Sequence, residues 1–522
     1  MPSWAAFLVA FISSACVLVL EIVAGRVLAP HVGVSLYTWT SVIGVVLAGL
    51  ALGNFLGGVA ADRWPNSRTL ALALLASGLA TLATPFLAQL VGLPPLDRLA
   101  ELVRIVAGAT VGFFLPAALL GAVSPILVRL LLRDLSRAGH LVGRLYACAT
   151  AGSILGTFAT GFVLIPAFGT RAIIVGVGVI LLLLAALAFW LGRLDAGRVA
   201  RAGGVAALAL ALLPLALSAA GWPPAVRAAL ESGCLRESSY FCIRILEDRV
   251  RDDSGLRQVQ TLMLDHMAHS VVDPDDPTYL RYSYIRLLAG FVDYAALQPA
   301  APRAIFFGGG GYSVPRYLVS RYPLAEADVV EIDPIVTEVA RERLGLREDA
   351  RLRTYAGDGR LALESLSAAA TYDIAVGDAF NDLSVPYHLA TREFAQQVLE
   401  LLGPDGLYAT HAIDRLHSGN FLRSYVHTLR SVFPHVYVLG NVPDWQADPK
   451  ESWVVVASRR PLDPSRLARV PGLTPDRNLS TALMPPDAFD AWLIAREPVL
   501  FTDDYVPVDT LLAPLFFDRI GG

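Results

Sequence analysis

The stretch Arg303-Ala-Ile-Phe-Phe-Gly-Gly-Gly-Gly-Tyr-Ser-Val-Pro-Arg316 runs from a short apolar strand into a turn of consecutive glycines. The backbone N–H groups of such a turn can approach a ligand closely, because no side chain stands in the way. A second apolar strand ends at Glu331 about twenty residues further on, which is the spacing found in nucleotide-binding α/β sheets. The pattern predicts that the turn holds one end of a nucleoside while Glu331 takes the ribose hydroxyls. The alternative is a tight strand-to-helix turn capped by an acidic strand end.

The composition divides the chain into two unlike halves. The chain has 522 residues and is 55% hydrophobic, which is too apolar for an ordinary soluble protein and long enough for two or more domains. Residues 1–221 contain 13 arginines and 6 acidic residues, whereas the remainder contains 29 basic and 40 acidic residues. The sequence therefore predicts an α-helical transmembrane bundle over residues 1–221, followed by an acidic globular half.

Seven apolar runs in the first half are long enough to span a bilayer. They cover residues 5–28, 37–61, 69–91, 105–128, 141–165, 173–191 and 205–220. Small residues such as Gly53 and Gly152 recur in these runs and permit close helix packing in lipid. Glu21 and Arg26 lie inside or at the end of the first run. They could form a structural ion pair, anchor the helix at the membrane interface or belong to a functional polar pocket. We expect an integral, multi-pass protein of the plasma (inner) membrane.

The charges of the loops and the cysteines bear on the orientation. Nine arginines lie in the loops after the second, fourth and sixth runs, and four lie in the loops after the first, third and fifth runs. By the positive-inside rule, seven spans then place the globular half outside. Cys234 and Cys242 stand eight residues apart and could pair in an oxidising compartment. The nucleosides that the glycine turn is predicted to bind are, in contrast, made in the cytosol, which favours the opposite side.

The second half alternates between strands and helices. Apolar strands are predicted at 304–307, 327–331, 352–355, 373–377, 406–411, 435–439 and 452–457, after a first β pair at 240–247 and 258–264. Helices are predicted at 279–292, 313–320, 334–343 and 391–402, and residues 265–277 are predicted to form an acidic loop. This alternation predicts a mostly parallel, doubly wound, Rossmann-like sheet. The expected domains are a linker at 222–237, a small antiparallel β subdomain at 238–284, the Rossmann-like domain at 285–460 and a C-terminal extension at 461–522.

Two further acids follow predicted strands of this sheet. Because ligands collect beyond the carboxyl ends of such strands, Asp358 could accept a hydrogen bond from an adenine amine, and Asp378 could take a proton from, or orient, an attacking amine. Each aspartate could instead cap the turn that follows its strand. Because no His and Cys cluster has metal-ligand spacing, no metal site is predicted.

Several motifs together resemble those of a known family. They are Thr261-Leu-Met-Leu-Asp265, the loop and helix from Asp273 to Tyr284, Gly308 to Gly311, Glu331-Ile-Asp333-Pro334, Gly357-Asp358-Gly359 and the segment from Asp378 to Leu389. With these motifs, residues 239–457 resemble the spermidine synthase family of aminopropyltransferases, whose core is the fold of class I S-adenosylmethionine methyltransferases. The two halves together resemble the membrane-fused branch of that family, in which a helical bundle precedes the synthase domain.

The resemblance implies a site and its ligands. It implies that decarboxylated S-adenosylmethionine is bound by Gly308, Gly309, Gly310, Glu331, Asp358 and Gly359. It also implies that Asp378 accepts the proton of an attacking polyamine such as putrescine or spermidine. No tightly bound cofactor and no nucleic acid are expected, the lipid bilayer is an expected partner, and a homodimer is compatible with this interpretation.

The chain departs from the family where the amine should bind. Soluble spermidine synthases have aspartates at the positions of Gly311 and Asn381, and a Tyr-His pair at Tyr282-Ser283. The candidates for binding the acceptor are therefore Tyr282, Asn381, Asp382, Asp503 and Asp504. Three interpretations follow: aminopropyl transfer, methyl transfer from S-adenosylmethionine itself, and a non-catalytic transporter or sensor that binds a nucleoside or a polyamine.

Overall fold

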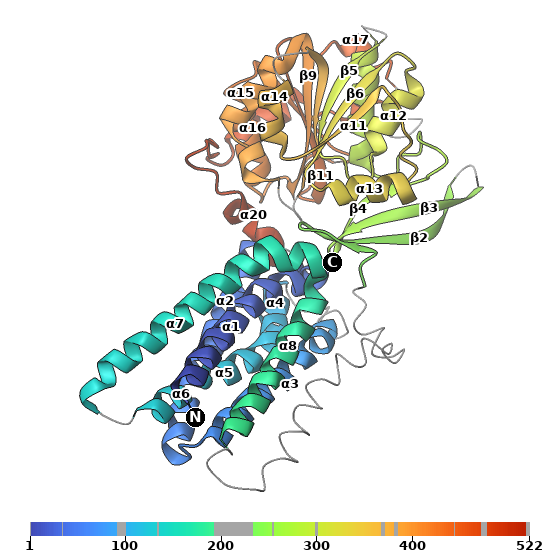
Figure 1. Cartoon of the computed structure of the whole chain (residues 1–522). Coiled ribbons are helices and arrows are strands. Elements are labelled where there is room, and N and C mark those ends of the chain that lie inside the picture. The colour runs from blue at the N-terminus through green and yellow to red at the C-terminus, as the bar shows by residue number, and fades with distance from the viewer. Residues whose placement is uncertain are drawn as a thin grey trace. The chain divides into compact units, whose positions relative to one another are not determined.

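The computed structural model describes most of the chain between residues 2 and 517. The residues within this range that lie outside the description are 34, 91–100, 133–134, 193–232, 253–254, 298–300, 367–370, 381–384, 443 and 471–477. The chain divides near Cys242 into two compact units, which are described separately (Figure 1).

The first unit is a bundle of long apolar helices. Six helical segments in the described part of the chain are long and apolar enough to cross a membrane. They are α1 (Ser3–Val32), α2 (Leu36–Arg63), α3 (Ser67–Gln89), the segment of α4 (Glu101–Ala109), η3 (Thr110–Phe114), α5 (Leu115–Gly121) and α6 (Val123–Leu131), the segment of α7 (Ala138–Ala159) and η5 (Thr160–Leu164), and α8 (Ile165–Leu191). Six of the predicted runs thus correspond to helices, and the seventh, at 205–220, lies outside the described residues.

Small residues bring the helices of this unit into backbone contact. A Cβ atom at Gly53 of α2 would collide with the carbonyl of Ala118 in α5. A Cβ atom at Gly152 of α7 would collide with the carbonyl of Phe11 in α1 in the same way. The close packing predicted from the sequence is therefore found, and in lipid it replaces the hydrophobic drive that water would supply.

Arg26 at the end of α1 has a structural role. Its guanidinium donates hydrogen bonds to the backbone carbonyls of Ser239 and Tyr240, at 2.7 and 2.8 Å. Among the described residues it forms no ion pair with Glu21, so the structure does not support the ion-pair alternative for Arg26. The same segment carries a disulfide between Cys234 and Cys242, whose Cα atoms are 5.3 Å apart.

The second unit contains an antiparallel sheet and a seven-stranded mixed sheet. In the first sheet β2 (Cys242–Asp252), β3 (Gly255–Leu264) and β4 (Met267–Val272) pair in sequence order. In the second sheet the strand order is β10-β11-β9-β8-β5-β6-β7. The strands are β5 (Arg303–Phe307), β6 (Glu326–Glu331), β7 (Leu352–Ala356), β8 (Tyr372–Gly377), β9 (Leu402–Arg415), β10 (His435–Leu439) and β11 (Lys450–Ser458). All neighbours from β9 to β7 are parallel, and β11 runs antiparallel to β9 and β10.

Helices cover both faces of the larger sheet. They are α11 (Ser283–Ala296), α12 (Ser313–Arg321), α13 (Pro334–Arg343), α14 (Gly359–Leu366), α15 (Arg392–Leu401) and α16 (Phe421–Arg430), followed by α17 (Pro464–Leu467), α18 (Leu479–Ala482), α19 (Pro486–Ile494) and α20 (Val508–Phe517). In Figure 1, α14, α15 and α16 gather on one side of the sheet, and α12 and α13 lie on the other. The predicted fold class, a helical bundle followed by a doubly wound Rossmann-like domain, is confirmed.

Two local predictions were wrong. Residues 265–277 were predicted to form a loop, but β4 (Met267–Val272) lies within them and pairs with β3. The buried positions of β4 include Ser270, so a polar residue interrupts the apolar alternation that normally marks a strand. The helix predicted from residue 279 starts at Ser283, because Tyr282 is still extended, with φ −80° and ψ 144°.

Candidate active site

The site lies where the carboxyl ends of four parallel strands meet. Glu331 is the last residue of β6, and Asp358 and Asp378 follow β7 and β8 closely. Backbone hydrogen bonds of 2.9 Å tie these ends together, from Asp378 N–H to Phe307, from Gly308 N–H to Val330 and from Gly357 N–H to Glu331. The three acids therefore share one edge of the sheet, which is where open α/β sheets bind ligands.

The glycine turn requires glycine at its first position. Gly308 has φ +99°, and a Cβ atom there would lie 2.8 Å from the carbonyl carbon of Asp378 and closer still to its oxygen. The N–H groups of Gly309 and Gly310 donate to Oε2 of Glu331 at 2.7 and 3.2 Å. The turn and the acid that ends β6 are thus one hydrogen-bonded unit.

Glu331 is almost fully buried, with 7% of its surface exposed. Its Oε1 accepts a third hydrogen bond, from Asp333 N–H at 3.0 Å. Burial raises the pKa of Glu331, although the backbone N–H groups that it accepts favour the charged form. An ionised carboxylate has about four acceptor positions, so Glu331 can still accept from a ribose hydroxyl.

Asp358 has local partners in this structure. Its Oδ1 accepts from the N–H groups of Arg360 and Leu361 at the start of α14, and its Oδ2 lies 2.7 Å from Nε2 of His388. Burial opposes the charge, but the hydrogen bonds from Leu361 and His388 lower the pKa of Asp358 overall. Asp358 therefore caps a helix, and its neighbour Gly359 is the first residue of that helix.

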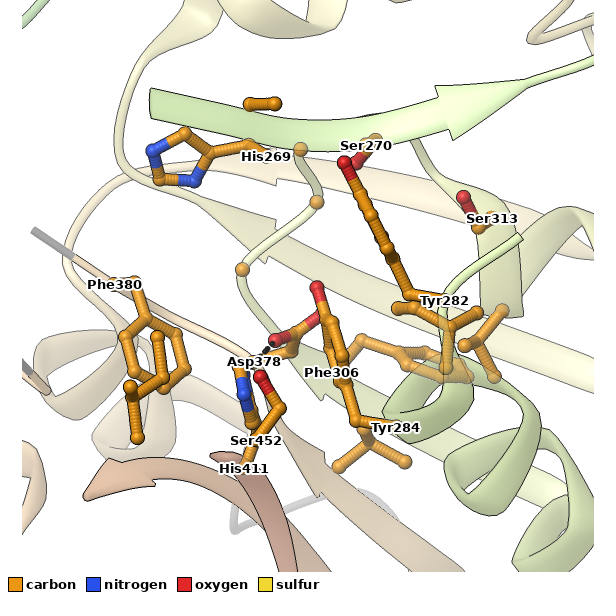
Figure 2. A pocket seen from close by; sticks show the side chains of 18 of the residues that line it. His269, Ser270, Tyr282, Tyr284, Phe306, Ser313, Asp378, Phe380, His411 and Ser452 are labelled. Carbon is orange, nitrogen blue, oxygen red and sulfur yellow. Dashed lines mark hydrogen bonds and ion pairs between the residues drawn. The ribbon is translucent and has the colours of Figure 1, made fainter. Parts of the chain in front are cut away.

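Asp378 and the glycine turn line one cavity of about 310 Å³. Gly308, Gly309 and Gly310 form part of its wall, and Tyr282 and Tyr284 form another part. Glu331, Asp358 and Gly359 do not line this cavity, although hydrogen bonds connect Glu331 to the turn. Figure 2 shows Asp378 beside His411 and Tyr284 in the cavity. The structure therefore brings Asp378, the glycine turn and Tyr282 together around one space.

The cavity wall is aromatic and has little positive charge. The rings of Tyr282 and Tyr284 stack at 5.9 Å, and burial raises the pKa of both phenols, so both remain protonated at neutral pH. Burial lowers the pKa of His269 to about 4, so this histidine is neutral as well. None of the described residues that line the cavity is Lys or Arg, whereas Asp378 and Glu451 are both among them. A cationic ligand fits such a wall better than an anionic one.

The structure shows why this chain differs from the family pattern at Gly311. Ser270 of β4 lies directly against this residue, and its hydroxyl accepts a hydrogen bond from Gly311 N–H at 3.0 Å. A Cβ atom at position 311 would lie 2.5 Å from Cβ of Ser270. An aspartate therefore does not fit at position 311 while Ser270 is present.

Of the remaining acceptor candidates, the structure describes only Asp503 and Asp504. Asn381 and Asp382 are outside the described residues. Asp503 forms two hydrogen bonds of 2.6 Å with the guanidinium of Arg360, and neither Asp503 nor Asp504 lines the cavity. The structure does not bring these two aspartates to Asp378.

Among the residues of the cavity wall that sequence reasoning missed are His269, Ser270 and His411. His269 and Ser270 belong to β4, which was predicted to be a loop. His411 was within reach, because the predicted strand 406–411 ends at it, and the carboxyl ends of strands in such a sheet carry the site.

Comparisons with known proteins show which sequences this region of the chain is similar to. The family model described as the spermine/spermidine synthase domain matches residues 284–449. A polyamine aminopropyltransferase of Vibrio vulnificus is 32% identical over 169 residues, which are 32% of this chain and 53% of that protein. The polyamine aminopropyltransferase 2 of Streptomyces coelicolor is 29% identical over 306 residues, which are 56% of this chain and 53% of that protein.

A methyltransferase is also among the relatives. The eEF1A lysine and N-terminal methyltransferase of Danio rerio is 28% identical over 151 residues, which are 27% of this chain and 21% of that protein. The chain spans about half of the length of the aminopropyltransferases of Vibrio vulnificus and Streptomyces coelicolor. Residues 284–449 match the family model of the spermine/spermidine synthase domain, and in this region the chain is similar to the polyamine aminopropyltransferases.

Proposed function

We propose that the protein is a membrane-bound enzyme that transfers an aminopropyl group from decarboxylated S-adenosylmethionine to a polyamine such as putrescine or spermidine. The observation that carries the proposal is the cavity in which Asp378 meets the glycine turn. In this assignment Gly308 to Gly310 and Glu331 bind the adenosine part of the donor, with Asp358 and Gly359 beside them. The polyamine enters the aromatic part of the cavity at Tyr282.

The reaction is an in-line displacement at a sulfonium. The lone pair of the acceptor amine attacks the aminopropyl carbon next to sulfur, and a new C–N bond forms. The C–S bond breaks, its electron pair goes to sulfur, and methylthioadenosine leaves as a neutral thioether. The proton of the attacking nitrogen passes to the carboxylate of Asp378, which also aligns the amine. The chain supplies binding, alignment and a proton acceptor.

The test is a donor comparison with the purified full-length protein. Decarboxylated S-adenosylmethionine with putrescine or spermidine is expected to give methylthioadenosine and the extended polyamine, as detected by mass spectrometry. Turnover of S-adenosylmethionine to S-adenosylhomocysteine would instead support methyl transfer. If neither product forms although nucleoside or polyamine binds, the non-catalytic interpretation holds.

Methyl transfer is the second candidate, because one structural feature favours it. With Gly311 and Ser270 in place, the cavity wall has no carboxylate where soluble spermidine synthases hold the aminopropyl nitrogen. That feature removes a contact that would select the decarboxylated donor over S-adenosylmethionine. The methyltransferase relative has a domain similar to this one.

Restoring the carboxylate tests how the donor is selected. We expect Gly311→Asp alone to destabilise the protein, because its Cβ collides with Ser270. The double variant Ser270→Gly/Gly311→Asp removes the collision with the Ser270 side chain and is expected to favour the decarboxylated donor by about tenfold or more in kcat/KM. Ser270→Gly is the matched control. An unchanged donor ratio in the folded double variant would show that position 311 does not select the donor.

The disulfide allows a test of the side on which the globular half lies. Structural disulfides persist in oxidising compartments, and the loop charges point to the same side. We expect an impermeant maleimide to label Cys234 and Cys242 in intact cells, and only after an impermeant reductant has been added. The variant Cys234→Ser/Cys242→Ser controls for Cys16 and Cys148, which are free. Labelling that requires permeabilised cells would contradict this side and place the site beside the cytosolic donor supply.

A further inference from the structure

We propose that His411 is a positioning residue that fixes the carboxylate of Asp378, an inference that rests on the group transfer proposed above. His411 lies on β9, the strand next to the one that Asp378 follows. Its Nδ1 is 3.3 Å from Oδ1 of Asp378, and Figure 2 shows this contact as a dashed line inside the cavity. No other side chain among the described residues bonds to Asp378.

The environment of the imidazole determines which nitrogen carries the proton. A carboxylate only accepts hydrogen bonds, so a hydrogen bond between His411 and Asp378 requires that Nδ1 of the imidazole carries the hydrogen. Nε2 is buried and has no hydrogen-bond partner among the described residues. A proton on Nε2 would therefore be a buried donor without an acceptor, which is costly. The Nδ1–H tautomer follows from both observations.

Aromatic contacts prevent the ring from turning. The imidazole stacks on Tyr284 with ring centres 3.8 Å apart and planes 10° from parallel. Phe380 packs against it at 4.3 Å, and only 4% of the His411 side chain is exposed. The direction of the N–H bond is therefore fixed by packing, and with it the orientation of the Asp378 carboxylate.

This arrangement assigns different tasks to the two oxygens of Asp378. Oδ1 is occupied by His411, and Oδ2 has no hydrogen-bond partner in the described part of the chain. Oδ2 is therefore the atom that accepts the proton of the attacking amine. Nδ1 of His411 is hydrogen-bonded to Asp378 and its Nε2 is buried, so we assign His411 a role that acts through Asp378. The other titratable groups that line the cavity with this pair are His269 on β4, Tyr282, Tyr284 on α11 and Glu451 on β11. His269 and the two tyrosines are uncharged at neutral pH, and Glu451 is the second acid of the wall.

Two substitutions of His411 test the contributions of its hydrogen bond and of its ring stacking separately. His411→Phe keeps the stack on Tyr284 and loses the hydrogen bond, whereas His411→Asn keeps a donor at the position of Nδ1 and loses the stack. We expect His411→Phe to lower kcat about 10- to 100-fold, with the KM values of donor and acceptor changed less than about threefold. We expect His411→Asn to recover most of this loss. His435→Phe, at the start of β10 and away from the cavity, is the control.

The outcomes distinguish this inference from the proposed function. If the wild-type protein transfers no group, the proposed function fails. If it is active and His411→Phe keeps kcat within about twofold, the positioning role is overturned, as it is if the loss appears only in KM. Nitrogen NMR of the labelled wild-type protein gives a readout without turnover: a protonated Nδ1 and a bare Nε2 are expected for His411, and the opposite tautomer would contradict the inference.

Discussion

Replacing Asp378 by asparagine is expected to lower kcat by about 10²- to 10⁴-fold, because the amide cannot accept the proton of the attacking amine. Donor binding is expected to change little, since the adenosine part of the donor is assigned to the glycine turn and Glu331. The side chain of asparagine has the shape of aspartate, so the bond to His411 and the cavity wall can be retained. Stopped reactions with product detection give kcat, and calorimetry with a non-reacting donor analogue gives the dissociation constant.

The same strand supplies a control for this variant. Asp373 lies near the amino end of β8, where its carboxylate accepts from the backbone N–H of Arg303 at 2.8 Å. Asp373→Asn is expected to retain the wild-type kcat, because this end of the strand is opposite to the site. Full turnover by Asp378→Asn would remove the proton acceptor from the mechanism. A loss of donor binding equal to the loss of turnover would instead indicate a role in binding.

The fold could be predicted because its signals are local. The apolar strand before Gly308 and the acidic end of the next strand are adjacent in the sequence, and they remain adjacent in β5 and β6. The alternation of short apolar strands with helices determines a parallel sheet almost by itself. The helices of the first unit could be predicted as well, because long apolar runs have few alternatives to membrane-spanning helices.

The inner wall of the site could not be predicted in the same way. Ser270 meets Gly311 across 41 positions of the sequence, and this contact depends on β4 lying over the glycine turn. His411 meets Asp378 across 33 positions, and nothing in the residues around either one specifies the pairing. Such contacts follow from tertiary packing, which periodicity and composition do not encode. The sequence therefore indicated which strand ends carry acids, and the structure shows which neighbours position them.

Replacing Glu331 by glutamine is expected to raise the dissociation constant of the donor about 100-fold, since hydrogen bonds to a charged acceptor are worth about 1.5–3 kcal/mol each. Three backbone N–H groups, from Gly309, Gly310 and Asp333, donate to this carboxylate. The amide of glutamine would point an N–H₂ group at one or two of these donors, so the turn would also lose its shape. Calorimetric titration with the donor analogue measures the effect.

The pH dependence of donor binding is a second test of the role of Glu331. Burial raises the pKa of Glu331, so on acidification the wild-type protein protonates this group at a higher pH than an exposed glutamate would. The protonated acid is a weaker acceptor for ribose hydroxyls, so donor affinity is expected to fall on acidification, and the fall is expected to begin at a higher pH than an ordinary glutamate would give. Glu331→Gln is expected to lack this fall. The control is Glu326→Gln at the other end of β6, where the carboxylate pairs with Arg353 at 3.0 Å and is 45% exposed. If Glu331→Gln binds the donor as tightly as the control at every pH, Glu331 does not contact the donor. The adenosine site would then have to lie elsewhere on the sheet.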